Sequence, residues 1–346
     1  MINDPAMLTG IILNGAHGIY DVHTEDGILR CTLRGKLKKA FAQAQSTKPL
    51  GKPRQIHSDK LLHMTPSQRT ERIEHQNTTP PPIRLSVGDY VKLRRIDATN
   101  GLIEEILPRQ SALVRKDAGS TPKKVVQQTM LANLDQVVLV FACGQPDPHF
   151  GMLDRYLTIC ESAELHSLIC LNKTDIPHPR YVDEATQLYS KLNYTVIWTS
   201  AQTGEGIAEL ALLLKDHTSL FTGPSGVGKS SLVNAIEPGM AIRTGLISDV
   251  TGKGRHTTTG SQLYPLSSGG WLADSAGIRA LTGWNILPEE LASCFVEFRP
   301  YLGECEFSDC VHIDEQGCAV LQAVQDGAID ERRYRSYVRI YNGEER

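Results

Sequence analysis

The chain has no apolar run long enough to cross a bilayer. Such a span needs about 18 or more consecutive apolar residues, and the apolar stretches of this sequence are much shorter. The first residues, MINDPAMLTGIILNGAHG, also lack the basic flank and long apolar stretch of a signal peptide. We therefore expect a cytoplasmic protein with no membrane segment.

Cysteine is scarce, with eight residues in a chain of 346. Three of them lie between positions 305 and 318, and the other five are scattered, mostly in apolar runs. This distribution fits a reducing compartment and one metal site better than a disulfide framework. The length allows two or three domains, and 40% apolar with 22% charged residues is typical of globular chains.

The net charge of −3 conceals one strongly basic segment. Residues 34–84 contain eleven Lys and Arg residues against three Asp and Glu residues, a balance of +8. One interpretation is a solvated loop, because charge runs usually lie in solvent. The other is a nucleic-acid footprint, because phosphates bind clustered Lys and Arg.

Short strands and turns alternate in the N-terminal third of the chain. Residues 8–33 and 84–117 mix apolar and β-branched residues with Gly, Asn-Gly and Pro. About five such strands, the last of them SALVRK, predict a small β-barrel of the OB-fold type spanning 1–117. Residues 40–82 are polar and basic, so we expect a long insertion there.

From about residue 134, buried strands alternate with helices. Near-continuous apolar runs at 136–142, 166–172, 194–200 and 218–223 are separated by amphipathic stretches. This pattern predicts a parallel sheet covered on both faces, in an α/β domain spanning 118–281. QLYPL and GWLADSAG predict two further strands. The tail, 282–346, predicts a small, mainly helical domain that needs a metal for stability.

The sequence GPSGVGKS fits the phosphate-loop motif G-x-x-x-x-G-K-[ST], between an apolar strand and a helix. Backbone N–H groups of such a loop enclose phosphates, and the helix N-terminus adds partial positive charge. We expect Lys229 to bridge the β- and γ-phosphates and Ser230 to bind Mg²⁺. The residues predicted to contact the phosphates are Gly223, Pro224, Ser225, Gly226, Val227, Gly228, Lys229, Ser230 and Ser231.

Recognition of the base is predicted for Asn172-Lys173-Thr174-Asp175, at a strand end. The Asp175 carboxylate can accept hydrogen bonds from guanine N1–H and the exocyclic amine, donors that adenine does not offer there. A site built on such bonds rejects an analogue by about 10⁴–10⁵. We expect Lys173 to lie along the base and Asn172 to join loops, with Ser200 and Ala201 supporting the base.

Two more segments follow the phosphate loop. In Asp274-Ser275-Ala276-Gly277, which fits D-x-x-G, we expect Asp274 to reach Mg²⁺ and the Gly277 N–H to meet the γ-phosphate. In GRHTTT (254–259), a switch segment, Thr258 is the expected Mg²⁺ ligand, with its neighbours Thr257 and Thr259 as the alternatives. Ile278 cannot orient water, so His256 joins Lys229 as a predicted catalytic residue, a surface histidine being the alternative.

The order of these motifs differs from that of ordinary small GTPases. There the phosphate loop comes first, whereas here the base-recognising segment precedes it. The same sheet forms if the old termini are joined and the chain is reopened after D-x-x-G, because termini usually lie close together. We therefore predict a circularly permuted P-loop GTPase domain.

The cysteine cluster predicts a structural zinc site. Its expected ligands are Cys305, Cys310, His312 and Cys318. Three thiolates and one imidazole make a closed tetrahedral set with no open position for chemistry.

Together these motifs resemble the ribosome small-subunit-dependent GTPase A (RsgA) family. The resemblance rests on ANLDQVVLVFA, DRYL, NKTD, GPSGVGKSSLVNAI, GRHTTT and the CAV after the last cysteine. It implies an OB-fold, a permuted GTPase domain, a zinc domain and late assembly of the small ribosomal subunit, which stimulates hydrolysis. The family shows Asp-Thr-Pro-Gly where this chain has Asp274-Ser275-Ala276-Gly277, and the basic insertion is longer than expected.

We therefore expect a monomeric GTPase, with Mg²⁺ and one Zn²⁺, that binds the small ribosomal subunit and its rRNA. Arginines of the last helix, Arg332, Arg333, Arg335 and Arg339, are either a second RNA contact or a solvated face. Two other functions stay open. One is a GTP-dependent RNA-binding module with incidental hydrolysis, which Ile278 favours. The other is a metal chaperone, which the closed ligand set disfavours.

Overall fold

The computed structural model describes residues 7–39, 84–116, 127–240, 262–273 and 286–344. These residues fall into two compact units, one drawn from Met1–Gln110 and Asp117–Gln127, the other from Ser111–Lys116 and Gln128–Arg346. Among the described helices, none is both long enough and apolar enough to span a membrane. Each unit is described by itself below.

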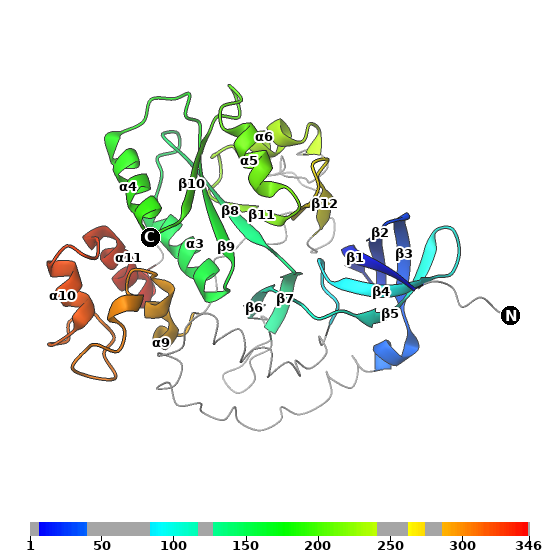
Figure 1. Ribbon diagram of the computed structural model, residues 1–346, viewed down its shortest axis with the longest axis horizontal. Helices are drawn as coiled ribbons and strands as arrows, with labels where there is room; N and C mark the ends of the chain where they lie inside the picture. Colours follow the sequence, from blue (N-terminus) through cyan, green and yellow to red (C-terminus); the bar gives the residue numbers. More distant parts are fainter. Residues whose placement is uncertain (1–6, 40–83, 117–126, 241–261, 274–285, 345–346) are drawn as a thin grey trace. The chain divides into compact units, whose positions relative to one another are not determined.

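The first unit contains a closed barrel of five strands in the order β1-β2-β3-β5-β4 (Figure 1). The strands are β1 Met7–Ala16, β2 Ile19–Thr24, β3 Gly27–Leu33, β4 Tyr90–Arg95 and β5 Asn100–Ile106. Alternate side chains point inward, and the interior is filled by residues such as Val22, Leu29, Val91, Leu93 and Ile103. The predicted N-terminal barrel is confirmed.

The expectation that SALVRK belongs to the barrel is wrong. This segment forms β6 Ala112–Lys116, which pairs with β7 Gln127–Ala132 in a separate two-stranded sheet. The barrel is already closed by five strands because LTGIILNGAHGIYDV supplies two of them. The chain reverses at His17 and Gly18, which have φ of 52° and 79°, the left-handed backbone that tight hairpins need.

The second unit contains a six-stranded sheet in the order β10-β9-β8-β11-β13-β12. The strands are β8 Gln136–Ala142, β9 His166–Asn172, β10 Thr195–Thr199, β11 Thr218–Thr222, β12 Leu263–Pro265 and β13 Trp271–Ala273. Five strands are parallel, and the edge strand β12 is antiparallel to β13. The predicted parallel sheet is therefore correct except at this edge.

Helices cover both faces of this sheet. They are α3 Phe150–Ser162, α4 Arg180–Lys191, α5 Ile207–Leu214 and α6 Lys229–Ile236. Val138 and Val140 of β8 share a core with leucines of α5 and α6, whereas Phe141 contacts Tyr156 of α3 on the opposite face. The carboxyl ends of the parallel strands meet at one edge, where ligands bind in such sheets.

The C-terminal part has a small aromatic core of its own. Its elements are α9 Pro288–Leu291, the 3₁₀ turns η3 Ala292–Cys294 and η4 Arg299–Tyr301, α10 Ala319–Gln325 and α11 Glu331–Tyr341. Phe295, Phe298 and Tyr337 pack together at its centre. Both interpretations of the α11 arginines are wrong for Arg333, which is only 1% exposed and pairs with two carboxylates.

Candidate guanine-nucleotide and metal sites

The predicted phosphate loop lies between β11 and α6. Three of its glycines have left-handed backbone, with φ of 143° at Gly223, 80° at Gly226 and 95° at Gly228. A Cβ atom at Gly223 would lie 2.0 Å from the carbonyl oxygen of Val140, and one at Gly228 would lie 2.3 Å from the Asn172 amide nitrogen. Both positions therefore require glycine for conformation and for space.

Lys229 is held inside this loop. Its Nζ atom donates to the carbonyl oxygens of Gly223 (2.9 Å) and Pro224 (2.7 Å), which keeps the ammonium beside the backbone predicted to enclose phosphates. Val227 is buried in the sheet core and anchors the loop. Ser225 is exposed, and Ser230 and Ser231 lie in the first turn of α6.

Asn172, the last residue of β9, joins two other loops. Its Nδ2 atom donates to the Val227 carbonyl of the phosphate loop at 2.8 Å. Its Oδ1 atom accepts from the Ala201 backbone N–H at 3.3 Å and from the Thr199 hydroxyl at 3.4 Å. The side chain is almost fully buried, so these bonds form away from water. The structure thus brings the two segments together from positions 55 residues apart.

Lys173 and Asp175 are positioned by the same arrangement. Lys173 has a φ of 69°, and its Nζ atom donates to the carbonyls of Gln145 (2.5 Å) and Gly226 (2.7 Å). The Ser200 hydroxyl donates to Asp175 Oδ1 at 2.5 Å. That bond orients the carboxylate predicted to recognise guanine.

Two supporting groups at this edge were not identified from the sequence. The Gln145 carbonyl accepts from Lys173, and the Glu205 carboxylate accepts from the Thr174 hydroxyl at 2.7 Å. A backbone acceptor such as Gln145 has no signature in the sequence, because every residue has a carbonyl. Glu205 was detectable in principle, since it follows Ser200 and Ala201 in the same loop.

Four predicted site residues lie outside the described residues. They are His256 and Thr258 of the switch segment and Asp274 and Gly277 of D-x-x-G. Of the expected Mg²⁺ ligands, the structure describes Ser230 alone.

The four predicted metal ligands lie close together. Their ligand atoms are all within 4.8 Å of one another. His312 Nδ1 lies 3.5 Å from Cys305 Sγ, 3.4 Å from Cys310 Sγ and 3.5 Å from Cys318 Sγ. The edges of a tetrahedral zinc site with bonds of ~2.3 Å to sulfur and ~2.0 Å to nitrogen are about 3.8 Å and 3.5 Å. The donor set therefore fits zinc in chemistry and in size.

The loop that carries His312 is held from two directions. Glu315 accepts backbone N–H bonds from Val311 and Ile313 at 2.8 and 2.9 Å. From α11, the Tyr337 hydroxyl donates to the Val311 carbonyl at 2.6 Å, and the Tyr334 hydroxyl donates to the Ile313 carbonyl at 2.8 Å. These bonds keep the left-handed backbone of His312, with φ of 61°, in place.

Comparisons with known proteins identify relatives of this chain. Residues 106–284 match the family model described as RsgA GTPase. The chain is 38% identical to "Small ribosomal subunit biogenesis GTPase RsgA" of Gemmatimonas aurantiaca, over 96% of each chain. It is 35% identical to the protein of the same name from Caldanaerobacter subterraneus, over 96% of this chain and 94% of that one.

Two solved structures resemble the whole chain. YjeQ from Thermotoga maritima has a TM-score of 0.68 and 30% identity, covering 98% of this chain and 99% of that one. YloQ, described as a circularly permuted GTPase, has a TM-score of 0.66 and 27% identity, covering 99% and 97%. The similarity therefore extends over the barrel, the sheet and the C-terminal elements.

Proposed function

The chain belongs to the RsgA GTPase family, and on that premise we propose that it assists a late step in the assembly of the small ribosomal subunit. Its activity is the hydrolysis of GTP to GDP and phosphate, which the subunit stimulates. Support for the ribosomal role comes from relatives named for small-subunit biogenesis, which align along 96% of this chain.

One observation carries the nucleotide assignment. The structure joins the segment predicted to bind guanine to the loop predicted to bind phosphate, through the Asn172–Val227 and Lys173–Gly226 hydrogen bonds. A guanine nucleotide that contacts Asp175 can therefore reach Lys229 and Ser230 without rearrangement of these two segments. Gly277 of D-x-x-G completes the proposed contacts at the γ-phosphate.

Two metal ions belong to this proposal. Mg²⁺ bound with GTP would neutralise phosphate charge, and Ser230, Thr258 and Asp274 are its proposed ligands. Zn²⁺ would be held by Cys305, Cys310, His312 and Cys318 and would stabilise the C-terminal fold. A closed set of four ligands leaves the zinc no place in the hydrolysis itself.

The proposed division is an RNA-binding barrel domain (1–117), a permuted GTPase domain (118–281) and a zinc domain (282–346). Basic residues of the 40–82 insertion supply positive charge for rRNA. The protein acts as a monomer in the cytoplasm. His256 positions the attacking water, because Ile278 has no group that can do so.

The second candidate is a GTP-dependent RNA-binding module in which hydrolysis is incidental, and Ile278 favours it. Multiple-turnover GTP hydrolysis, measured with and without purified small subunits, separates the two. We expect strong stimulation by small subunits and none by large subunits. Co-sedimentation in GDP and in a non-hydrolysable GTP analogue should show tighter binding with the analogue. Equal binding in both nucleotides, with no stimulation, would exclude an assembly GTPase.

A further inference from the structure

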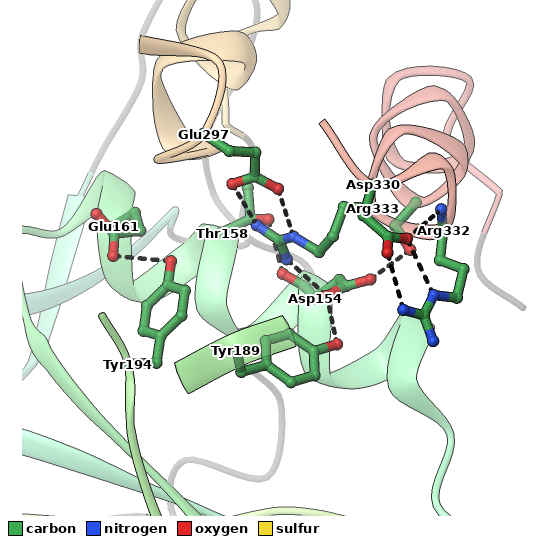
Figure 2. Close-up of polar contacts among 10 residues, drawn as sticks. Asp154, Thr158, Glu161, Tyr189, Tyr194, Glu297, Asp330, Arg332 and Arg333 are labelled. Atoms are coloured by element: carbon green, nitrogen blue, oxygen red, sulfur yellow. Dashed lines mark hydrogen bonds and ion pairs between the residues drawn. The ribbon is translucent and has the colours of Figure 1, made fainter. Parts of the chain in front are cut away.

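A buried network joins the C-terminal elements to the helices of the GTPase sheet. Figure 2 shows Arg333 of α11 between Asp154 of α3 and Glu297. The guanidinium donates to Asp154 Oδ1 at 2.6 Å and to Glu297 Oε1 at 2.6 Å. All three side chains are at most 6% exposed. Because removing one partner from a buried ion pair leaves an uncompensated charge, a substitution at any of these three residues should disturb the packing of α11 on α3.

The Asp154 carboxylate also accepts two hydrogen bonds from hydroxyl groups. It accepts from the Tyr189 hydroxyl of α4 at 2.7 Å and from the Ser336 hydroxyl of α11 at 2.5 Å. Burial and the Asp154 carboxylate raise the pKa of Tyr189 well above its usual value, so the phenol remains a donor. The Arg333 guanidinium also lies 4.6 Å from the centre of the Phe295 ring. One carboxylate therefore fixes α3, α4 and α11 to one another.

These helices begin where the loops of the nucleotide site end. The loop between β8 and α3 carries Gln145 and ends at His149, whose Nδ1 accepts from the Met152 N–H and caps α3. The Gln145 carbonyl accepts from Lys173, which also donates to Gly226 of the phosphate loop. The other helix, α4, follows the guanine-binding segment directly. A displacement of α3 therefore moves Gln145, one partner of Lys173, whereas a displacement of α4 moves the segment that carries Lys173 itself.

We propose that Arg333 is a remote positioning residue of the guanine-nucleotide site. Its contact with Asp154 fixes α3 and α4, and the loops that precede these two helices carry Gln145 and its hydrogen-bond donor Lys173. The inference rests on the proposed function of that site. It also implies the reverse effect, since coupling between two events is reciprocal: a bound guanine nucleotide strengthens the docking of the C-terminal elements on α3.

The test compares two neighbouring arginines of α11 in the full-length protein. Arg333→Met removes the buried positive charge, leaves Asp154 and Glu297 without their cation, and keeps much of the side-chain volume. Arg332→Met is the matched control, because Arg332 is half-exposed and pairs with Asp330, the cap of its own helix. Equilibrium titration with fluorescent GDP gives Kd, and steady-state hydrolysis on small subunits gives KM and kcat.

For Arg333→Met we expect Kd and KM to rise about 3- to 30-fold, the usual range of coupling through packed networks, with kcat within about twofold of wild type. Arg332→Met should match wild type. Limited proteolysis should also show that GDP protects the C-terminal elements less in Arg333→Met than in wild type.

Wild-type Kd in a zinc-loaded Arg333→Met protein that unfolds at lower temperature would overturn the inference and leave Arg333 a stabilising residue only. If Arg333→Met does not fold, Tyr189→Phe and Ser336→Ala each remove a single bond to Asp154 and should raise Kd about two- to threefold, the low end of the range for coupling through packed networks. Unchanged Kd in both would likewise overturn it. Failure of the wild type to bind guanine nucleotides would instead refute the proposed function.

Discussion

At the scale of single residues, the segment predicted to bind guanine shows what a motif does and does not specify. The residue types of Asn172 and Asp175 predict their chemistry, since an amide can join two loops and a carboxylate can accept from guanine. Their neighbours depend on the fold: Asn172 meets Val227, and Asp175 meets Ser200. The sequence therefore predicts which side chains form the candidate site better than it predicts their hydrogen-bond partners.

Asp175→Asn should weaken GTP binding by about 10- to 100-fold, the cost of a lost charged hydrogen bond, and should admit xanthosine triphosphate. The amide presents a donor to guanine N1–H, whereas it can pair with the 2-oxo group of xanthine. Titrations with both nucleotides measure the change. Asp183→Asn, at a half-exposed carboxylate of α4, is the control and should keep the guanine preference. A variant that still prefers GTP would remove Asp175 from the base site.

His256→Ala should bind GTP and small subunits almost normally, yet lose most of the stimulated hydrolysis. Ile278 leaves no side chain after D-x-x-G able to hold water, and a water-positioning group is worth about 10²–10⁴ in rate. Single-turnover hydrolysis on saturating small subunits is the measurement. His166→Ala, at the exposed start of β9, should hydrolyse normally. A loss of no more than about threefold in the His256→Ala rate would be far smaller than that effect. The water-positioning group would then have to be Arg255 or a group supplied by the ribosome.

At the scale of elements, strands were the most predictable part of the fold. β8, β9 and β11 are almost fully buried, so their apolar runs are unambiguous. The edge strand β12 has only three residues and one neighbour, so its direction depends on pairing that no local pattern encodes. In α11, the burial of Arg333 depends on Asp154, 179 positions away, and a helical period cannot specify that partner.

Cys310→Ser should lose zinc and loosen α10 and α11. Structural zinc supplies folding free energy directly, and Cys318, another proposed ligand, caps α10. Zinc content per chain and hydrogen exchange of the two helices measure the loss. The control is Cys294→Ser, at a buried cysteine of the same region whose thiol donates to the Glu290 carbonyl, and it should keep one zinc. Stoichiometric zinc in Cys310→Ser would exclude Cys310 as a ligand.

At the scale of the whole molecule, two connections join the proposed nucleotide site to the C-terminal elements. The first is covalent, since the chain after Gly277 leads directly into residues 282–346. The second consists of the buried contacts of Arg333 with α3. The motif order predicts the first. The second appears only in the fold, because it needs side chains from three separate segments.

The insertion at 40–82 lies within the basic segment 34–84, whose balance is +8, and is the proposed rRNA contact. If residues 40–82 contact rRNA, the affinity for small subunits should fall steeply with salt, because phosphate binding releases counterions. Replacing Lys48, Lys52 and Arg54 with Gln should weaken that affinity and reduce the salt slope by about one per lost phosphate contact, hence about three. Affinity for free GTP should not change, because these residues lie outside the predicted nucleotide motifs.

The control removes three exposed cations of the other unit, Arg180, Lys191 and Lys215, by the same change to Gln. Both triple variants alter the net charge equally, so a general electrostatic effect would weaken them alike. Co-sedimentation with small subunits at four salt concentrations gives the slopes. A slope that falls in the first variant and not in the control assigns the contact to the insertion. If the salt slope is the same in both variants, the insertion makes no specific contact and is a solvated loop. The RNA contact would then have to come from the barrel itself.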